Sequence, residues 1–231
     1  FILPERYTPA PKTEAALIGT MPCTTTVATF TEDQDIVVIN FSSLLAQGKT
    51  LNRIAAFIEK AGLPHDHVLD DTALQTAIQT SGADEQTYYY GHDYQAQDLR
   101  RFFTQAAQQA LPLTTQEVWL RQLLERMGWL HPNTNGALIT LAATGAGLTP
   151  ALRPVILRHE IAHGAFYPVP AYRTYTEQLW HDLPADDQAA FKEFLGSQGY
   201  DTHLEELMLN EMQAYLAFTP DNHFFNAQAI N

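Results

Sequence analysis

Two histidines four residues apart, with a glutamate directly after the first, stand in the stretch LRHEIAHGAFY at residues 157 to 167. In an α-helix His159 and His163 lie one turn apart on one side, and Glu160 lies about 60° from His163 around the axis. Two imidazoles placed in this way can bind one metal ion, while a neighbouring carboxylate reaches a water molecule at an open coordination position. The residue types and their spacing therefore predict metal-assisted hydrolysis with Glu160 as the general base.

A pair of core histidines, hydrogen-bonded to the backbone with Glu160 in solvent, is the alternative interpretation. Random order would place this pattern in a chain of this composition roughly 0.02 times, so chance is a poor explanation. Apolar residues recur with the histidines at three- and four-residue steps, namely Leu152, Ile156 and Phe166, so both histidines are expected to face inward. Two buried imidazoles without a ligand would leave polar atoms unsatisfied, which favours the metal site.

A catalytic zinc ion has three protein ligands and an open position, so one more ligand is needed. Glu211 lies in LEELMLNEMQAYLAF at residues 204 to 218. At helical spacing it occupies the middle of an apolar face, whose other members are Leu204, Leu207, Met208, Tyr215 and Phe218. A carboxylate buried there is costly unless it is paired or bound to a metal. We predict one zinc ion per chain, held by His159, His163 and Glu211.

Other residues compete for the place of the third ligand. Glu205 and Glu206 stand at the start of the same helix, where a solvated carboxylate is ordinary. His181 and His203 stand at the edges of predicted helices. These four positions remain the alternatives to Glu211.

The combination of His159-Glu160-x-x-His163 with Asn210-Glu211-x-x-Ala214-Tyr215 resembles the gluzincin metallopeptidases. Longer segments look like an uncharacterised bacterial family expected to be zinc peptidases: GHDYQAQDLRRFF, RHEIAHGAFYPVPAYRTYTEQLW, FLGSQGYD and LNEMQAYL, within roughly residues 85 to 220. The resemblance implies a zincin-like fold with a two-helix zinc site. The sequence departs from the thermolysin-like pattern at Tyr215, where that pattern has an aspartate.

Two further residues are candidates for the catalytic machinery. Tyr215 lies one turn after Glu211, so it is expected to accept a hydrogen bond from a ligating histidine, to stabilise the developing oxyanion, or simply to pack. His223, in TPDNHFF, is a candidate oxyanion donor, with an exposed tail histidine as the alternative. His92 and Asp93, in YYYGHDY, either approach the zinc cleft or form a capping turn before the next helix.

The sequence patterns around these residues predict strands and helices that form an α+β fold, mostly helical. Together with the resemblance, they predict one zincin-like domain over residues 1–231. An extended leader is expected over 1–15, a small sheet and helices over 16–142, and a zinc-binding helical half over 150–220. A β-hairpin is predicted over 24–30 and 35–41, and a strand over 135–143. Helices are predicted over 50–63, 71–82, 94–111, 114–130, 154–166, 170–181, 184–197 and 203–218.

The strand over 135–143 precedes the motif helix, which leaves two interpretations. As an edge strand it would hold an extended substrate by backbone pairing, and as a buried strand it would not touch the substrate.

Composition limits the partners. The formal charge is −13 and the only adjacent basic pair is Arg100-Arg101, so no nucleic-acid partner is expected. No run of 18 apolar residues occurs, so no transmembrane segment is expected. Cys23 is the only cysteine, which excludes an internal disulfide. The chain begins at Phe1 without a visible signal peptide; a processed amino terminus would favour export, to the periplasm or outside the cell, over the cytoplasm.

Together these features predict zinc-dependent hydrolysis of peptide bonds in a peptide or protein substrate. A metal-dependent hydrolase of a non-peptide amide is one alternative. A catalytically idle interaction protein that keeps the zinc site is the other, although a structural site usually has four protein ligands and no use for Glu160.

Overall fold

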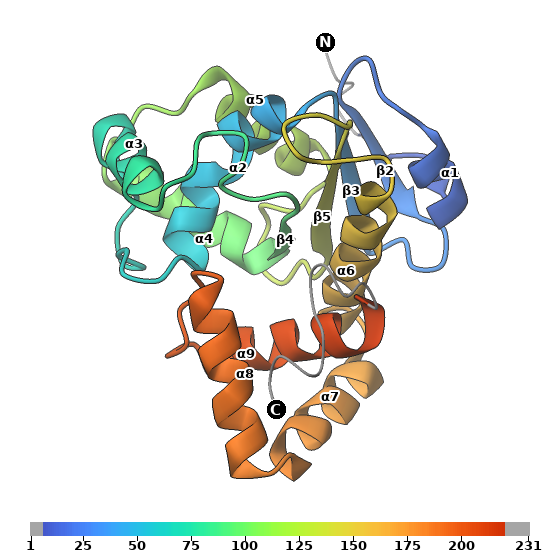
Figure 1. Ribbon diagram of the computed structural model, residues 1–231. Coiled ribbons are helices and arrows are strands. Elements are labelled where there is room, and N and C mark those ends of the chain that lie inside the picture. Colours follow the sequence, from blue (N-terminus) through green and yellow to red (C-terminus); the bar gives the residue numbers. More distant parts are fainter. Residues whose placement is uncertain (1–6, 220–231) are drawn as a thin grey trace.

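The structure, a computed structural model, describes residues 7–219. It is α+β, with about half of its residues helical and one small mixed sheet (Figure 1). The strands are β1 (Pro11–Lys12), β2 (Thr26–Phe30), β3 (Ile36–Phe41), β4 (Asp93–Gln95) and β5 (Ala137–Ala142). The helices are α1 (Glu14–Gly19), α2 (Leu44–Ile58), α3 (Asp71–Thr80), α4 (Ala96–Gln108), α5 (Thr115–Arg126), α6 (Leu152–Phe166), α7 (Pro170–Asp182), α8 (Ala185–Ser197) and α9 (Glu205–Gln213), continued by the π-helix η1 (Ala214–Phe218).

The sheet has the strand order β1-β2-β3-β5-β4. The predicted hairpin is confirmed, because β2 and β3 pair antiparallel with Thr26 opposite Asn40. β5 then pairs parallel with β3 and antiparallel with β4. It is therefore an interior strand with all six residues buried, and the interpretation of it as an edge strand is wrong. The short strand β4 lies at the edge instead.

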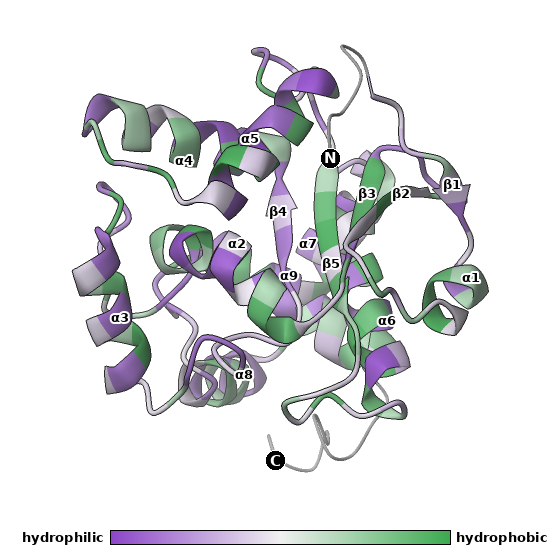
Figure 2. Ribbon diagram, turned by 90° about the horizontal axis from the view of Figure 1, so that it is seen from above, coloured by the Kyte–Doolittle hydropathy of each residue, from purple (hydrophilic) through white to green (hydrophobic). Residues whose placement is uncertain are grey.

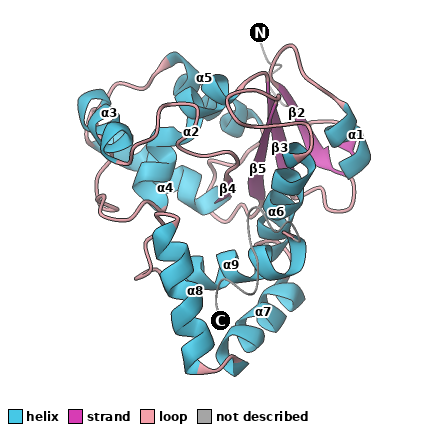
Figure 3. Cartoon of the chain, viewed as in Figure 1, coloured by secondary structure: helices cyan, strands magenta, loops and turns pink. Residues whose placement is uncertain are grey.

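Helices cover both faces of the sheet (Figures 2 and 3). Successive residues of a strand point to opposite faces, and the buried residues of β3 divide accordingly. Val37, Ile39 and Phe41 pack with the apolar sides of α2, α4 and α5. Ile36 and Val38 pack on the other face with Leu17 of α1 and with α6. The helix that carries the motif is thus fixed directly against the sheet.

A third core lies below the sheet, between α7, α8 and α9 (Figure 1). Its buried members are Phe166, Trp180, Phe191, Leu195, Met208, Leu209 and Met212. Phe166, the last residue of α6, is the link between the motif helix and this lower core. None of the helices in the described range has the length and apolar character needed to cross a membrane.

Local differences from the predicted elements have local causes. α2 begins at Leu44 rather than Thr50, because the Ser43 hydroxyl accepts a hydrogen bond from Ala46 N and caps the helix about two turns earlier. Within the predicted leader, Pro11–Lys12 is extended and pairs with β2, and α1 begins at Glu14 with a cap from Thr13. Both features are only a few residues long, which periodicity does not detect.

Candidate metal centre

The motif helix α6 is anchored at its first turn by the buried side chain of Arg153. Its guanidinium donates four hydrogen bonds, to Ala142 O (2.9 Å), Ile18 O (2.6 Å), Thr20 O (3.0 Å) and Asn40 Oδ1 (3.1 Å). Later in the helix, Gly164 permits close packing, because a Cβ there would lie 3.0 Å from Ile36 Cγ2. The anchor and the close approach fix the helix that carries both histidines.

The predicted ligands meet where α9 crosses α6. His159, His163 and Glu211 are 8%, 1% and 2% exposed. The two Nε2 atoms lie 3.0 Å apart, and Glu211 Oε2 lies 3.5 Å from His159 Nε2 and 3.6 Å from His163 Nε2. Ligands of a tetrahedral zinc ion are separated by about 3.3 Å, given bonds of about 2.0–2.1 Å. These three atoms have a spacing that a metal ion fits, and the three residues form a group that could hold one.

Electrostatics in this cluster also suit a cation. Burial lowers the pKa of His159 to about 4, against the opposing effect of Asp93, so the imidazole is neutral at pH 7 as a metal ligand must be. The pKa of Glu211 is raised to about 7, mainly by burial; His163 opposes this rise, Asp93 adds to it, and a hydrogen bond from Tyr200 opposes it. Glu211 Oε2 is buried without a hydrogen-bond partner among the described residues. A cation between the three ligands would compensate that buried oxygen.

Thr219 determines which nitrogen of His159 is free. Its hydroxyl donates to Ala214 O at 2.9 Å, and its oxygen lies 2.9 Å from His159 Nδ1. Because the hydroxyl proton is committed to Ala214, the hydrogen bond to the imidazole requires Nδ1 to be the donor. The neutral ring then presents the lone pair of Nε2 to Glu211 and His163, which is the tautomer that binds a metal.

Removing this acceptor should weaken metal binding without removing a ligand. We expect Thr219→Val to lower zinc affinity by about 10- to 100-fold, the usual effect of losing an outer hydrogen bond to a ligating histidine. The measurement is a zinc titration against a competing chromophoric chelator. Thr176→Val is the matched control, because Thr176 is also buried and also donates to a backbone carbonyl, Tyr172 O, but in α7. Equal affinity in Thr219→Val and in the parent protein would disprove the role of Thr219.

Tyr215 does not provide the hydrogen-bond acceptor for His159, since Thr219 does. Its ring packs edge-on against the imidazole, with 4.8 Å between the ring centroids, and its side chain hydrogen-bonds with Tyr200. Of the three roles predicted for Tyr215, packing is observed. A role toward the oxyanion stays a prediction, since Tyr215 also lines the cavity.

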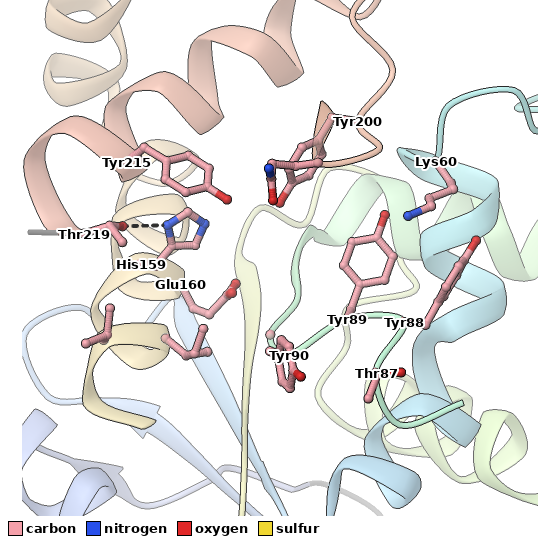
Figure 4. Close-up of a pocket in the computed structure, with 14 residues that line it drawn as sticks. Lys60, Thr87, Tyr88, Tyr89, Tyr90, His159, Glu160, Tyr200, Tyr215 and Thr219 are labelled. Atoms are coloured by element: carbon pink, nitrogen blue, oxygen red, sulfur yellow. Dashed lines mark hydrogen bonds between the residues drawn. The ribbon is translucent and has the colours of Figure 1, made fainter. Parts of the chain in front are cut away.

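Glu160 faces a cavity of about 260 Å³, which His159, Tyr215 and Tyr200 also line (Figure 4). Burial raises the pKa of Glu160 well above its usual value, and the charges of Asp93, Glu211 and Glu59 add to the shift. Glu160 Oε2 has no hydrogen-bond partner among residues 7–219. The carboxylate is thus buried beside the histidines and free to contact a molecule in the cavity.

The opposite wall approaches Glu160 through a glycine. A Cβ added to Gly91 would lie 2.1 Å from Glu160 Oε1 and 2.9 Å from Ile156 Cγ2. Only a residue without a side chain fits there, so the segment Tyr88–Gly91 can line the cavity beside the motif helix.

Asp93 and His92 separate into different environments. Asp93 Oδ1 lies 3.9 Å from His163 Nε2, and its Oδ2 accepts a 2.9 Å hydrogen bond from Tyr167. His92 is buried, with Nδ1 2.7 Å from the Tyr94 hydroxyl. Asp93 therefore approaches the ligand cluster, although it is not part of the three-residue group, and His92 is a core histidine.

The rival ligands lie outside the cluster. Glu205, Glu206, His181 and His203 are exposed, and Glu206 forms an ion pair with Arg173 at 3.2 Å. His223 lies outside the described residues. Sequence reasoning missed Thr219, Gly91 and Tyr200; a threonine just after the glutamate helix and a glycine in an aromatic segment carried no pattern by which to find them.

No family model, no curated protein and no solved structure matches this chain.

Proposed function

We propose that the protein is a zinc-dependent peptide-bond hydrolase of the gluzincin type, with His159, His163 and Glu211 as the zinc ligands. The observation that carries this proposal is the convergence of three ligand atoms within 3.6 Å, beside Glu160, whose buried Oε2 has no hydrogen-bond partner among residues 7–219. Zinc bound there would supply a Lewis acid that polarises the substrate carbonyl and makes water more acidic.

In this proposal Glu160 does the proton transfer. It accepts a proton from the water molecule that attacks the carbonyl carbon, and it donates that proton to the leaving amide nitrogen as the C–N bond breaks. Its position one residue after His159 and on the wall of the cavity supports this assignment. Tyr215, which lines the same cavity, is the candidate donor to the oxyanion.

The Glu160 carboxylate favours hydrolysis over a purely structural metal site. A structural zinc site usually has four protein ligands, whereas the described residues supply a group of three. Glu160, the acidic residue next to this group, lines a cavity, and its Oε2 has no hydrogen-bond partner among the described residues. These features are expected of a site that leaves one coordination position for a reacting molecule.

A peptide-library digest tests the proposed function. Purified protein loaded with zinc should cleave a subset of the peptides, and cleavage should stop after chelation and return with added zinc. Mass spectrometry of the products measures this outcome. A library of small non-peptide amides, run in parallel, tests the alternative that the protein hydrolyses non-peptide amides. Absence of cleavage in both libraries would leave only the alternative of a catalytically idle interaction protein that keeps the zinc site.

The close contact between Gly91 and Glu160 makes a separate prediction. Gly91→Ala should force the Glu160 carboxylate to move and should lower turnover by about 100-fold, the scale of loss expected for a base displaced by about 1 Å. Zinc content should not change, because no ligand is touched. Gly19→Ala is the control, since nothing lies within 4 Å of a Cβ at that position. Normal turnover in Gly91→Ala would show that the base does not need this position.

A further inference from the structure

Lys60 stands on the wall of the cavity that faces the motif helix. It follows α2 closely and forms an isolated antiparallel bridge with Tyr200. Beside it, Ala61 N donates to Gly199 O at 3.2 Å, so this backbone is joined to the loop between α8 and α9. Figure 4 shows Lys60 and Tyr89 across the cavity from Glu160. The lysine is therefore held by its backbone at the junction of the two halves of the molecule.

Its ammonium group lies over aromatic rings, and the charge of the neighbouring Glu59 also acts on it. Lys60 Nζ lies 4.7 Å from the centroid of the Tyr88 ring and 5.0 Å from that of Tyr89. Gly199 leaves room for it, since a Cβ there would lie 2.9 Å from Nζ. An ammonium has three N–H donors, and within residues 7–219 it has neither an ion pair nor a hydrogen-bond acceptor. Cation–π contacts fix its place and leave its donors available.

The charges around the cavity make this ammonium distinctive. Among the described residues that line the cavity, Lys60 is the only lysine or arginine. Glu160 and Glu211 together would offset the charge of a divalent cation, while Asp93, 3.9 Å from His163, and Glu59 add negative charge near the metal end. On the described wall of the cavity, the side chain that offers a positive charge to an anion is Lys60. Partial burial strengthens its interaction with an anion, and the same burial lowers the pKa of Lys60.

We propose that Lys60 binds a carboxylate of the substrate and so selects peptides that carry one at a fixed distance from the cleaved bond. This inference rests on the proposed peptide hydrolysis and deepens it. The carboxylate comes either from an aspartate or glutamate side chain or from the carboxyl terminus of the peptide. Both sources offer the same oxygens to an ammonium group.

Binding tests this selection independently of catalysis. The probe is a synthetic peptide library in which each glutamate-containing peptide has a matched glutamine version and a shuffled version of equal charge. The library is passed over zinc-loaded Glu160→Gln protein, and retained peptides are quantified by mass spectrometry. Glutamate at one position should increase retention about 10-fold or more relative to glutamine, as expected for a partly buried charged hydrogen bond.

Two lysine variants in the same background show whether Lys60 causes that preference. Lys60→Met should abolish the preference for glutamate while peptides with neutral residues are retained as before. Lys192→Met should keep it, because Lys192 also lies over an aromatic ring, 5.8 Å from Trp180, but outside the cavity. Retention with no carboxylate preference, or a preference that survives in Lys60→Met, overturns the proposal.

Two further measurements identify the source of the carboxylate and test the proposed hydrolysis. Free and amidated carboxyl termini distinguish a terminal carboxylate from a side chain, since only the former is lost on amidation. A digest of the same library by the parent protein should show the same preference as the binding experiment. If binding shows the Lys60-dependent preference and no peptide is cleaved, the hydrolase proposal fails and carboxylate binding stands. If peptides are cleaved without that preference, the hydrolase proposal stands and carboxylate binding by Lys60 fails.

Discussion

Replacing Glu160 with glutamine should abolish most hydrolysis and leave the metal in place. We expect about one zinc per chain in both proteins, because Glu160 is not among the three predicted ligands. Turnover should fall by about 100- to 10,000-fold, the usual contribution of a general base. Glutamine has nearly the shape of glutamate, so the close contact with Gly91 is preserved. Elemental analysis and the rate on a peptide from the library digest are the two measurements.

His159→Ala is the comparison for this variant. It should lose both zinc and turnover, because it removes a ligand. Comparison of the two variants distinguishes the loss of the general base from the loss of zinc binding. Release of zinc by Glu160→Gln would make Glu160 a ligand and would contradict the assigned role, and full activity would exclude it as the base.

Glu211 should be the carboxylate on which metal binding depends. We expect Glu211→Gln to lower zinc affinity by more than about 100-fold, beyond the effect of losing an outer hydrogen bond. The amide keeps the volume of this buried side chain, so a loss of affinity is not a loss of packing. Circular dichroism and thermal unfolding of the metal-free proteins check that both fold. A competitive zinc titration measures the affinity.

Glu205→Gln and Glu206→Gln are matched controls from the same helix. Both residues are exposed, and both stand in the first turn of α9. Their replacement should change zinc affinity by less than about threefold, since exposed carboxylates are solvated and screened. Tight binding by Glu211→Gln would remove the third ligand and with it the gluzincin assignment.

The parts of the fold that sequence predicts well are those with long periodic patterns. The helices α6, α7 and α8 agree with prediction within two residues at each end, because their apolar spacing and their prolines act locally. The short strands β1 and β4 were missed, since two or three residues carry no periodicity. The interior place of β5 depends on β4 pairing beside it, and a local pattern does not report a pairing between distant segments.

The site divides in the same way. His159, Glu160 and His163 could be found because their spacing within one helix has a chemical meaning. Glu211 could be found because a carboxylate on an apolar helical face is unusual. Thr219 could not, since its contact with His159 depends on how two helices cross and on the turn before it. Lys60 also could not, because its place on the cavity comes from a bridge to Tyr200, 140 residues away along the chain.

The π-helical turn η1 makes the site sensitive to the length of the chain. Its hydrogen bonds span five residues instead of four, and the bond from the Thr219 side chain to Ala214 O spans the same interval. Loss of one codon within this turn would favour an ordinary α-helix and would rotate every later residue by about 100°. His159 would then lose its acceptor, although both histidines and both glutamates of the site would still be encoded. A gene with the complete ligand pattern can therefore still specify a misoriented ligand, and only the spacing between Glu211 and Thr219 distinguishes the two cases.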